Sequence, residues 1–121
     1  MKILIVDDIL EVAKYFKSDL EFWGHSAEYV LCGASAVDTL KKDNSYDFVL
    51  MDYWQGNVLP HGDFWRNEIM RSNQLYKDKV YIYSAWSGLE EKLPFFLKKK
   101  DAVKFINKIS GIEMDKKNES N

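Results

Sequence analysis

Short apolar segments alternate with amphipathic segments along the chain. Lys2–Val6 and Phe48–Met51 are almost entirely apolar, which is typical of strands that are covered on both faces. From Ile9 to Trp23, apolar residues recur every three or four positions, which predicts a helix with one buried side that ends near Gly24. This alternation of strand and helix patterns predicts an α/β protein.

The same alternation continues to the end of the chain. We expect further strands over Ala27–Leu31, Val80–Tyr83 and Ala102–Ile106, and further helices over Ala34–Lys42, from Phe64 to about Asn73, and around Leu89, Leu93, Phe96 and Leu97. Strands that alternate with helices through short connections predict a parallel sheet with helices on both faces. In such folds the functional crevice lies at the carboxyl ends of the strands.

The composition agrees with a single folded domain. The chain has 121 residues, of which 46% are hydrophobic and 30% charged, and its formal net charge is −2. A charge so close to zero argues against binding to nucleic acid or to an anionic membrane. The single cysteine, Cys32, excludes an internal disulfide and favours a reducing, cytoplasmic location. We expect one domain over residues 1–114 and a polar tail over residues 115–121 that is disordered or a linker stub.

Charged and hydroxyl side chains stand at the ends of the expected strands. Asp7 and Asp8 follow the first strand, Asp52 follows the third, Ser84 follows the fourth and Lys108 follows the fifth. Three carboxylates at one edge stay ionised together only if a cation shares the site. Oxygen ligands without His or Cys suit Mg²⁺, or a similar ion such as Mn²⁺, better than zinc. A carboxylate beside such an ion and a lysine can also accept a phosphoryl group.

Four segments together resemble the receiver domain of two-component response regulators. They are Ile3–Asp8, Phe48–Asp52, Ile82–Ala85 and Phe105–Lys108, and the likeness spans residues 1 to about 109. The resemblance implies a flavodoxin-like fold, a doubly wound five-stranded parallel sheet with strand order 2-1-3-4-5. The chain would have four full helices, and a fifth helix that is short or absent because few apolar residues follow Lys108.

The resemblance also implies how the acidic residues act. Asp52 would be the phosphoacceptor, charged from the phosphohistidine of a sensor histidine kinase or a phosphotransfer protein. Asp7, Asp8 and Asp52 would hold Mg²⁺ together with the backbone carbonyl of Trp54. The chain would therefore take part in its own phosphotransfer and dephosphorylation without being a turnover enzyme.

Three further residues match the phosphoryl-binding and switch positions of the family. Ser84 and Lys108 would contact the phosphoryl group, and Phe105 would be the aromatic residue that moves inward on phosphorylation. The change would alter the face around the fourth helix and the fifth strand and control a downstream protein, or an output domain outside this chain. We expect a monomer or a weak homodimer, without direct binding to nucleic acid or membrane.

Two tryptophans flank the expected site. Trp54 is two residues after Asp52, and Trp86 is two residues after Ser84. One hypothesis is that the two indoles exclude water and slow the hydrolysis of the aspartyl phosphate. The alternative is that they only pack against the loop that follows Asp52.

Other functions remain open at this stage. Asp8 and Glu11 also fit a helix N-cap with its capping-box partner, and Asp52 fits an ordinary turn at a strand end. A pseudo-receiver, an interaction scaffold that is never phosphorylated, is favoured by the long loop after Asp52 and by Ile109, which stands where the family has a proline. A phosphatase on the same fold is disfavoured because Trp54 occupies the place of its second aspartate.

Overall fold

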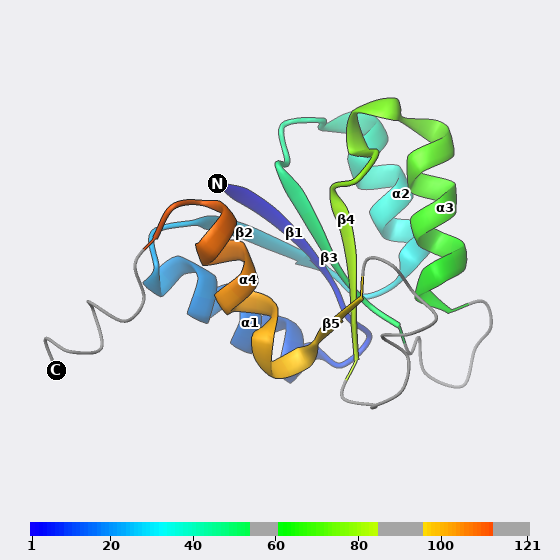
Figure 1. Cartoon of the computed structure of the whole chain (residues 1–121). Coiled ribbons are helices and arrows are strands. Elements are labelled where there is room, and N and C mark those ends of the chain that lie inside the picture. Colours follow the sequence, from blue (N-terminus) through cyan, green and yellow to red (C-terminus); the bar gives the residue numbers. More distant parts are fainter. Residues whose placement is uncertain (54–60, 85–95, 113–121) are drawn as a thin grey trace, which may run out of the picture.

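The fold is a parallel sheet between two pairs of helices (Figure 1). The computed structural model describes residues 1–53, 61–84 and 96–112. The strands are β1 (Lys2–Val6), β2 (Ser26–Val30), β3 (Phe48–Asp52), β4 (Val80–Ser84) and β5 (Phe96–Lys98). The helices are α1 (Leu10–Phe22), α2 (Gly33–Lys42), α3 (Gly62–Ser72) and α4 (Ala102–Ile109), with short 3-10 turns η1 (Gln74–Tyr76) and η2 (Lys99–Asp101). The sheet order is β2-β1-β3-β4-β5 with all neighbours parallel, which confirms the predicted fold.

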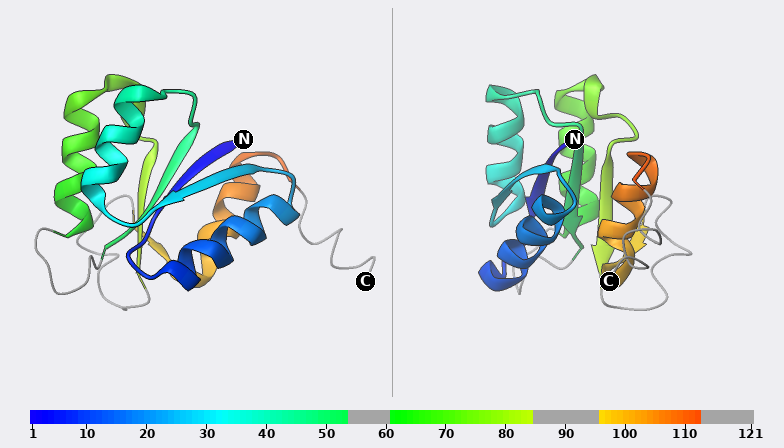
Figure 2. Two further views of the ribbon diagram at one scale, coloured as in Figure 1. Left: turned by 180° about the vertical axis from the view of Figure 1, so that it is seen from behind. Right: turned by 90° about the vertical axis from the view of Figure 1, so that its left-hand side faces the viewer.

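The two helix pairs cover opposite faces of the sheet. Helices α1 and α4 lie on one face, and α2 and α3 lie on the other (Figure 2). Ile3 and Ile5 of β1 pack with residues of α1 and α4, whereas Leu4 and Val6 pack with residues of α2 and α3. Because β1 and β3 are covered on both faces, they are apolar almost throughout rather than alternating. Within the described ranges, no helix has both the length and the apolar character needed to cross a bilayer.

The C-terminal elements differ from those predicted. Ala102–Ile106, expected as the fifth strand, belongs to α4, and the fifth strand is Phe96–Lys98. The buried residues Ala102, Val103 and Ile106 are spaced as on one side of a helix, and they pack against the core beside α1. The strand β5 has only three residues, too few to show a strand period. Residues 89–95 of the helix expected before it lie outside the described residues.

A buried polar contact lies at the amino-terminal edge of the sheet. The Nε2 atom of His25, which precedes β2, lies 2.7 Å from Oδ1 of Asn107 in α4, and both residues are buried. The hydroxyl of Ser110, just after α4, lies 3.1 Å from the sulfur of Met1. Helix α4 therefore ends at the amino edge, on the side of the sheet opposite to the carboxyl ends of the strands.

Candidate functional site

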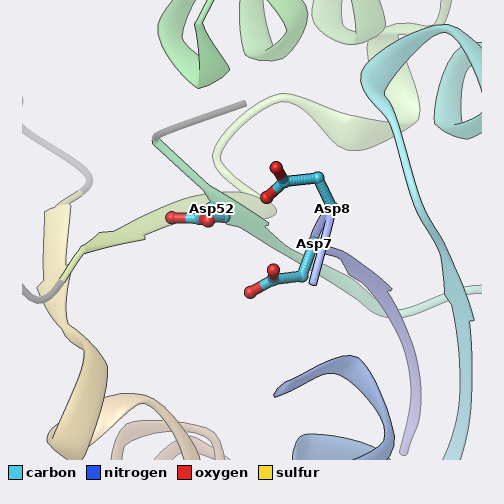
Figure 3. Close-up of side chains that lie close together, drawn as sticks. All are labelled: Asp7, Asp8 and Asp52. Atoms are coloured by element: carbon cyan, nitrogen blue, oxygen red, sulfur yellow. The ribbon is translucent and has the colours of Figure 1, made fainter. Parts of the chain in front are cut away.

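Three carboxylates gather at the carboxyl edge of the sheet. Asp7 and Asp8 follow β1, and Asp52 is the last residue of β3 (Figure 3). One carboxylate oxygen from each residue lies within 4.8 Å of the other two. The structure thus brings together the three acidic residues that the sequence placed at strand ends.

Strand register explains why these residues meet. Asp52 pairs in register with Tyr83 of β4, and Asp7 directly follows the last residue of β1 that pairs with β3. Leu50 and Ile5, two positions earlier on their strands, both lie in the core beneath α1 and α4. Because side chains alternate along a strand, Asp7, Asp52 and Tyr83 form a row on that same face, at its carboxyl edge.

Asp7 is the most enclosed of the three carboxylates. It is 1% exposed, whereas Asp8 is exposed and Asp52 is half-buried. Its Oδ1 accepts a hydrogen bond from the backbone N–H of Ile9 at 2.9 Å, and its Oδ2 accepts one from the hydroxyl of Tyr83 at 2.5 Å. Burial raises the pKa of Asp7 above its usual value and the charge of Asp8 adds to the rise, although the two hydrogen bonds act in the opposite direction.

This donor set fits a hard divalent cation. Mg²⁺ binds oxygens at about 2.1 Å and therefore holds opposite ligands about 4.2 Å apart. The three carboxylate oxygens, which lie within 4.8 Å of one another, are close to that separation. A cation would also offset the repulsion and the desolvation that raise the pKa of Asp7. Trp54, whose backbone carbonyl was expected to complete the ligand set, and Trp86 lie outside the described residues.

Ser84 stands at the same edge of the sheet. It is the last residue of β4, it is buried, and it follows Tyr83, which pairs with Asp52. On its other side, Ser84 pairs in register with Lys98 of β5. A hydroxyl therefore lies between the strand that carries Asp52 and the edge strand of the sheet.

Several solved structures that are similar to this chain share one fold. No family model and no curated protein matches the sequence. The chemotaxis protein CheY4 of Vibrio cholerae matches 88% of this chain and 96% of its own, with a TM-score of 0.74 and 17% identity. The N-terminal domain of a response regulator/sensory box/GGDEF protein of Carboxydothermus hydrogenoformans matches 92% of this chain and 91% of its own, with a TM-score of 0.73 and 24% identity. The chain has the receiver-domain fold.

One neighbour with this fold was solved with a metal ion. The response regulator TrrA of Thermotoga maritima, in complex with Mg²⁺-BeF, matches 76% of each chain with a TM-score of 0.62 and 23% identity.

Two of the predicted site residues lie away from this edge of the receiver-domain fold. Lys108 is exposed in the last turn of α4, which ends at the opposite, amino edge of the sheet. Phe105 lies on the same helix, and its ring packs against Tyr81 with the centroids 4.8 Å apart. Their expected position at the end of the fifth strand was wrong because Ala102–Ile106 is helical.

Lys99 is the cation that the sequence analysis missed. It directly follows β5, whose Lys98 pairs with Ser84, so its backbone lies at the carboxyl edge of the sheet; its charge also lowers the pKa of Asp7. Phe96, three residues earlier, is the aromatic residue of β5. The signal in the sequence is the lysine run Lys98–Lys100, which directly follows the apolar residues expected to form the fourth helix. Ile109 does not follow β5, and the residue after Lys99 is Lys100, which is also not a proline.

Proposed function

We propose that this chain is a phosphoacceptor switch of a two-component system and that Asp52 accepts a phosphoryl group from a phosphohistidine. The donor is a sensor histidine kinase or a phosphotransfer protein. The observation that carries the proposal is the position of Asp52, half-buried at a strand end with two further carboxylates within 4.8 Å. In the transfer an oxygen of Asp52 bonds to phosphorus, the phosphorus–nitrogen bond breaks, and the imidazole leaves and takes up a proton.

The residues around Asp52 supply the groups that this transfer needs. Asp7, Asp8 and Asp52 would each offer a carboxylate oxygen to Mg²⁺, with Asp8 the most exposed of the three. When bound, Mg²⁺ neutralises charge on the transferring phosphoryl group. Lys99 brings a positive charge to the same edge, and the hydroxyl of Ser84 donates a hydrogen bond to a phosphoryl oxygen.

The pairing of β4 with β5 suggests how the switch acts on a partner. Ser84 pairs in register with Lys98, so a phosphoryl group that draws Ser84 toward Asp52 also acts on β5. The strand β5 is one of the two edge strands of the sheet, and Lys98 in it is exposed. A downstream protein, or an output domain outside this chain, would recognise the altered face around β5. The chain undergoes its own modification in this proposal and does not turn over a substrate.

Intact mass measurement tests the proposal. The protein is incubated with acetyl phosphate and Mg²⁺, with matched samples in EDTA, and Asp52→Asn is compared with Asp63→Asn, a change at an exposed aspartate of α3. We expect a single phosphoryl adduct that requires Mg²⁺, that persists in Asp63→Asn and that is absent from Asp52→Asn.

The same experiment distinguishes the pseudo-receiver scaffold. A folded protein that binds Mg²⁺ but forms no adduct with acetyl phosphate or with a panel of phosphorylated histidine kinases would be a scaffold with a residual metal site. A folded protein without either property would be a scaffold alone. Either result would overturn the phosphoacceptor proposal.

A further inference from the structure

A phenol reaches the acidic cluster from the core side. Tyr83 is fully buried, and its ring packs against Phe16 of α1 with the centroids 4.9 Å apart. Its hydroxyl donates a hydrogen bond of 2.5 Å to Oδ2 of Asp7. The row of strand residues places Tyr83 beside Asp52 as well, because the two are register partners.

The contact from Tyr83 completes the set of donors to Asp7. One carboxylate oxygen accepts from the N–H of Ile9 and the other from Tyr83, at 2.9 Å and 2.5 Å. With one donor on each oxygen, the plane of the carboxylate is fixed, and one of its oxygens is held within 4.8 Å of an oxygen of Asp8 and of Asp52. Without the phenol, one oxygen of a carboxylate that is 1% exposed would lose its donor.

We infer that Tyr83 is a positioning residue of the Mg²⁺ site, which acts on the ion through Asp7 without binding it. The inference rests on the proposed function, since it assigns a residue to the metal site of that switch. Partners that hold a metal-binding carboxylate from behind orient it and tune its affinity for the ion.

A role in packing alone does not account for the hydroxyl. A phenylalanine would fill the same space against Phe16, whereas a buried hydroxyl without a partner costs free energy. A phenol keeps its proton at neutral pH, and burial and the neighbouring Asp7 raise the pKa of Tyr83 further, so the hydroxyl remains a donor. The contact with Asp7 therefore accounts for the hydroxyl, which orients the carboxylate of that residue.

The test compares Tyr83→Phe with Tyr81→Phe. Tyr81 lies on the same strand and the same face, two residues earlier, and packs against Phe48 and Phe105 rather than against the carboxylates. The dissociation constant for Mg²⁺ is measured by calorimetric titration, and the free energy of unfolding is measured separately in EDTA. We expect Tyr83→Phe to weaken Mg²⁺ binding about tenfold or more, and Tyr81→Phe to leave it within about twofold.

The unfolding measurement separates positioning from packing. A packing role alone would lower the free energy of unfolding in EDTA and leave the dissociation constant unchanged. The phenol acts through Asp7, so we also expect Tyr83→Phe to add little to the loss of Mg²⁺ binding that Asp7→Asn causes. A folded Tyr83→Phe protein with wild-type Mg²⁺ affinity would overturn the inference and leave the proposed function intact.

A second measurement applies to the wild-type chain, in case Tyr83→Phe does not fold. The hydroxyl proton of Tyr83 is identified by NMR through its proximity to the ring protons of Tyr83 itself, which are assigned from their contact with the ring of Phe16, and it is followed during Mg²⁺ titration. We expect its signal to shift in step with saturation, and a signal that does not move would contradict the inference. Wild-type protein that binds no Mg²⁺ at all would overturn both the inference and the metal-dependent function.

Discussion

The backbone of Gly62, the first residue of α3, lies directly against the backbone of Asp52. A Cβ atom added to Gly62 would stand 2.7 Å from the carbonyl oxygen of Asp52 and 3.0 Å from the Cα atom of Tyr53. The N–H of Gly62 also donates a hydrogen bond of 2.8 Å to the carbonyl of Tyr53. The beginning of α3 is therefore held against the strand end that bears the proposed phosphoacceptor.

Replacement of Gly62 by alanine should disturb both stability and the site. Because the added Cβ meets backbone atoms rather than a flexible side chain, either α3 or the end of β3 must move. We expect Gly62→Ala to lower the free energy of unfolding by about 1–3 kcal/mol, measured by chemical denaturation. Asp63→Ala, at the next and exposed position, is the control. Equal stability of the two variants would mean that α3 accommodates the methyl group.

The position of Lys99 leads to a prediction that reverses the one made from sequence. Lys99 follows β5 at the carboxyl edge, whereas Lys108 is exposed at the opposite edge. We expect Lys99→Met to slow formation of the acetyl phosphate adduct about tenfold or more, because a positive charge near the transferring group is lost. Lys108→Met should keep the wild-type rate. The rates are followed by intact mass, and the opposite ranking of the two variants would restore the original prediction.

The buried contact between His25 and Asn107 should contribute to stability but not to metal binding. Its atoms lie 2.7 Å apart, and the contact ties α4 to the segment that precedes β2. We expect Asn107→Ala to lower the free energy of unfolding by about 1–3 kcal/mol, since His25 loses a buried partner. The Mg²⁺ affinity of the folded variant should be unchanged because the cluster lies at the other edge. A variant with lower affinity but full stability would contradict this separation.

An ion pair near the start of β1 should make stability depend on pH in acid. The Nζ of Lys2 donates to Asp43 at 2.8 Å, and the hydroxyl and N–H of Ser45 donate to the same carboxylate. These contacts, with that of Lys2 the largest, hold the pKa of Asp43 below its usual value of 3.8. The ionised carboxylate therefore stabilises the fold above about pH 4, and this contribution disappears as the pH falls through the lowered pKa.

Asp43→Asn tests the ion pair. The variant should be less stable than the wild type at neutral pH, and the difference should shrink in acid, as measured by denaturation across a pH series. Asp63→Asn is the control, because Asp63 is exposed at the start of α3. A difference that stays constant at all pH values would show that the charge of Asp43 is not the cause.

The first four strands and the acidic cluster could be predicted because each signal is local. In β1 and β3, a continuous apolar run leads directly into the carboxylates, so the same segment predicts both the strand and the candidate functional residue at its end. The topology then brings the strand ends to one edge whatever the details of the loops. This is why Asp7, Asp8 and Asp52 could be expected to meet before any contact was known.

The end of the chain could not be predicted in the same way. The strand β5 has three residues and adjoins a lysine run, whereas α4 begins with apolar residues that also fit a buried strand. The prediction exchanged the strand and the helix, so Lys108 and Phe105 were expected at the carboxyl edge of the sheet although they belong to α4. Tyr83 was missed for a different reason: its hydrogen bond joins positions 76 residues apart, and the pattern indicated only a buried residue of a strand.

The row formed by Asp7, Asp52 and Tyr83 exists only when the strands pair in the correct register. If β3 slipped by one residue against its neighbours, Asp52 would turn toward α2 and α3, and Met51 would take its place among the carboxylates. A misregistered sheet could be compact and rich in secondary structure, yet it would hold no cluster. Tight Mg²⁺ binding would thus serve as a quality check for refolded or redesigned versions of this chain, because only correct strand pairing assembles the ligands.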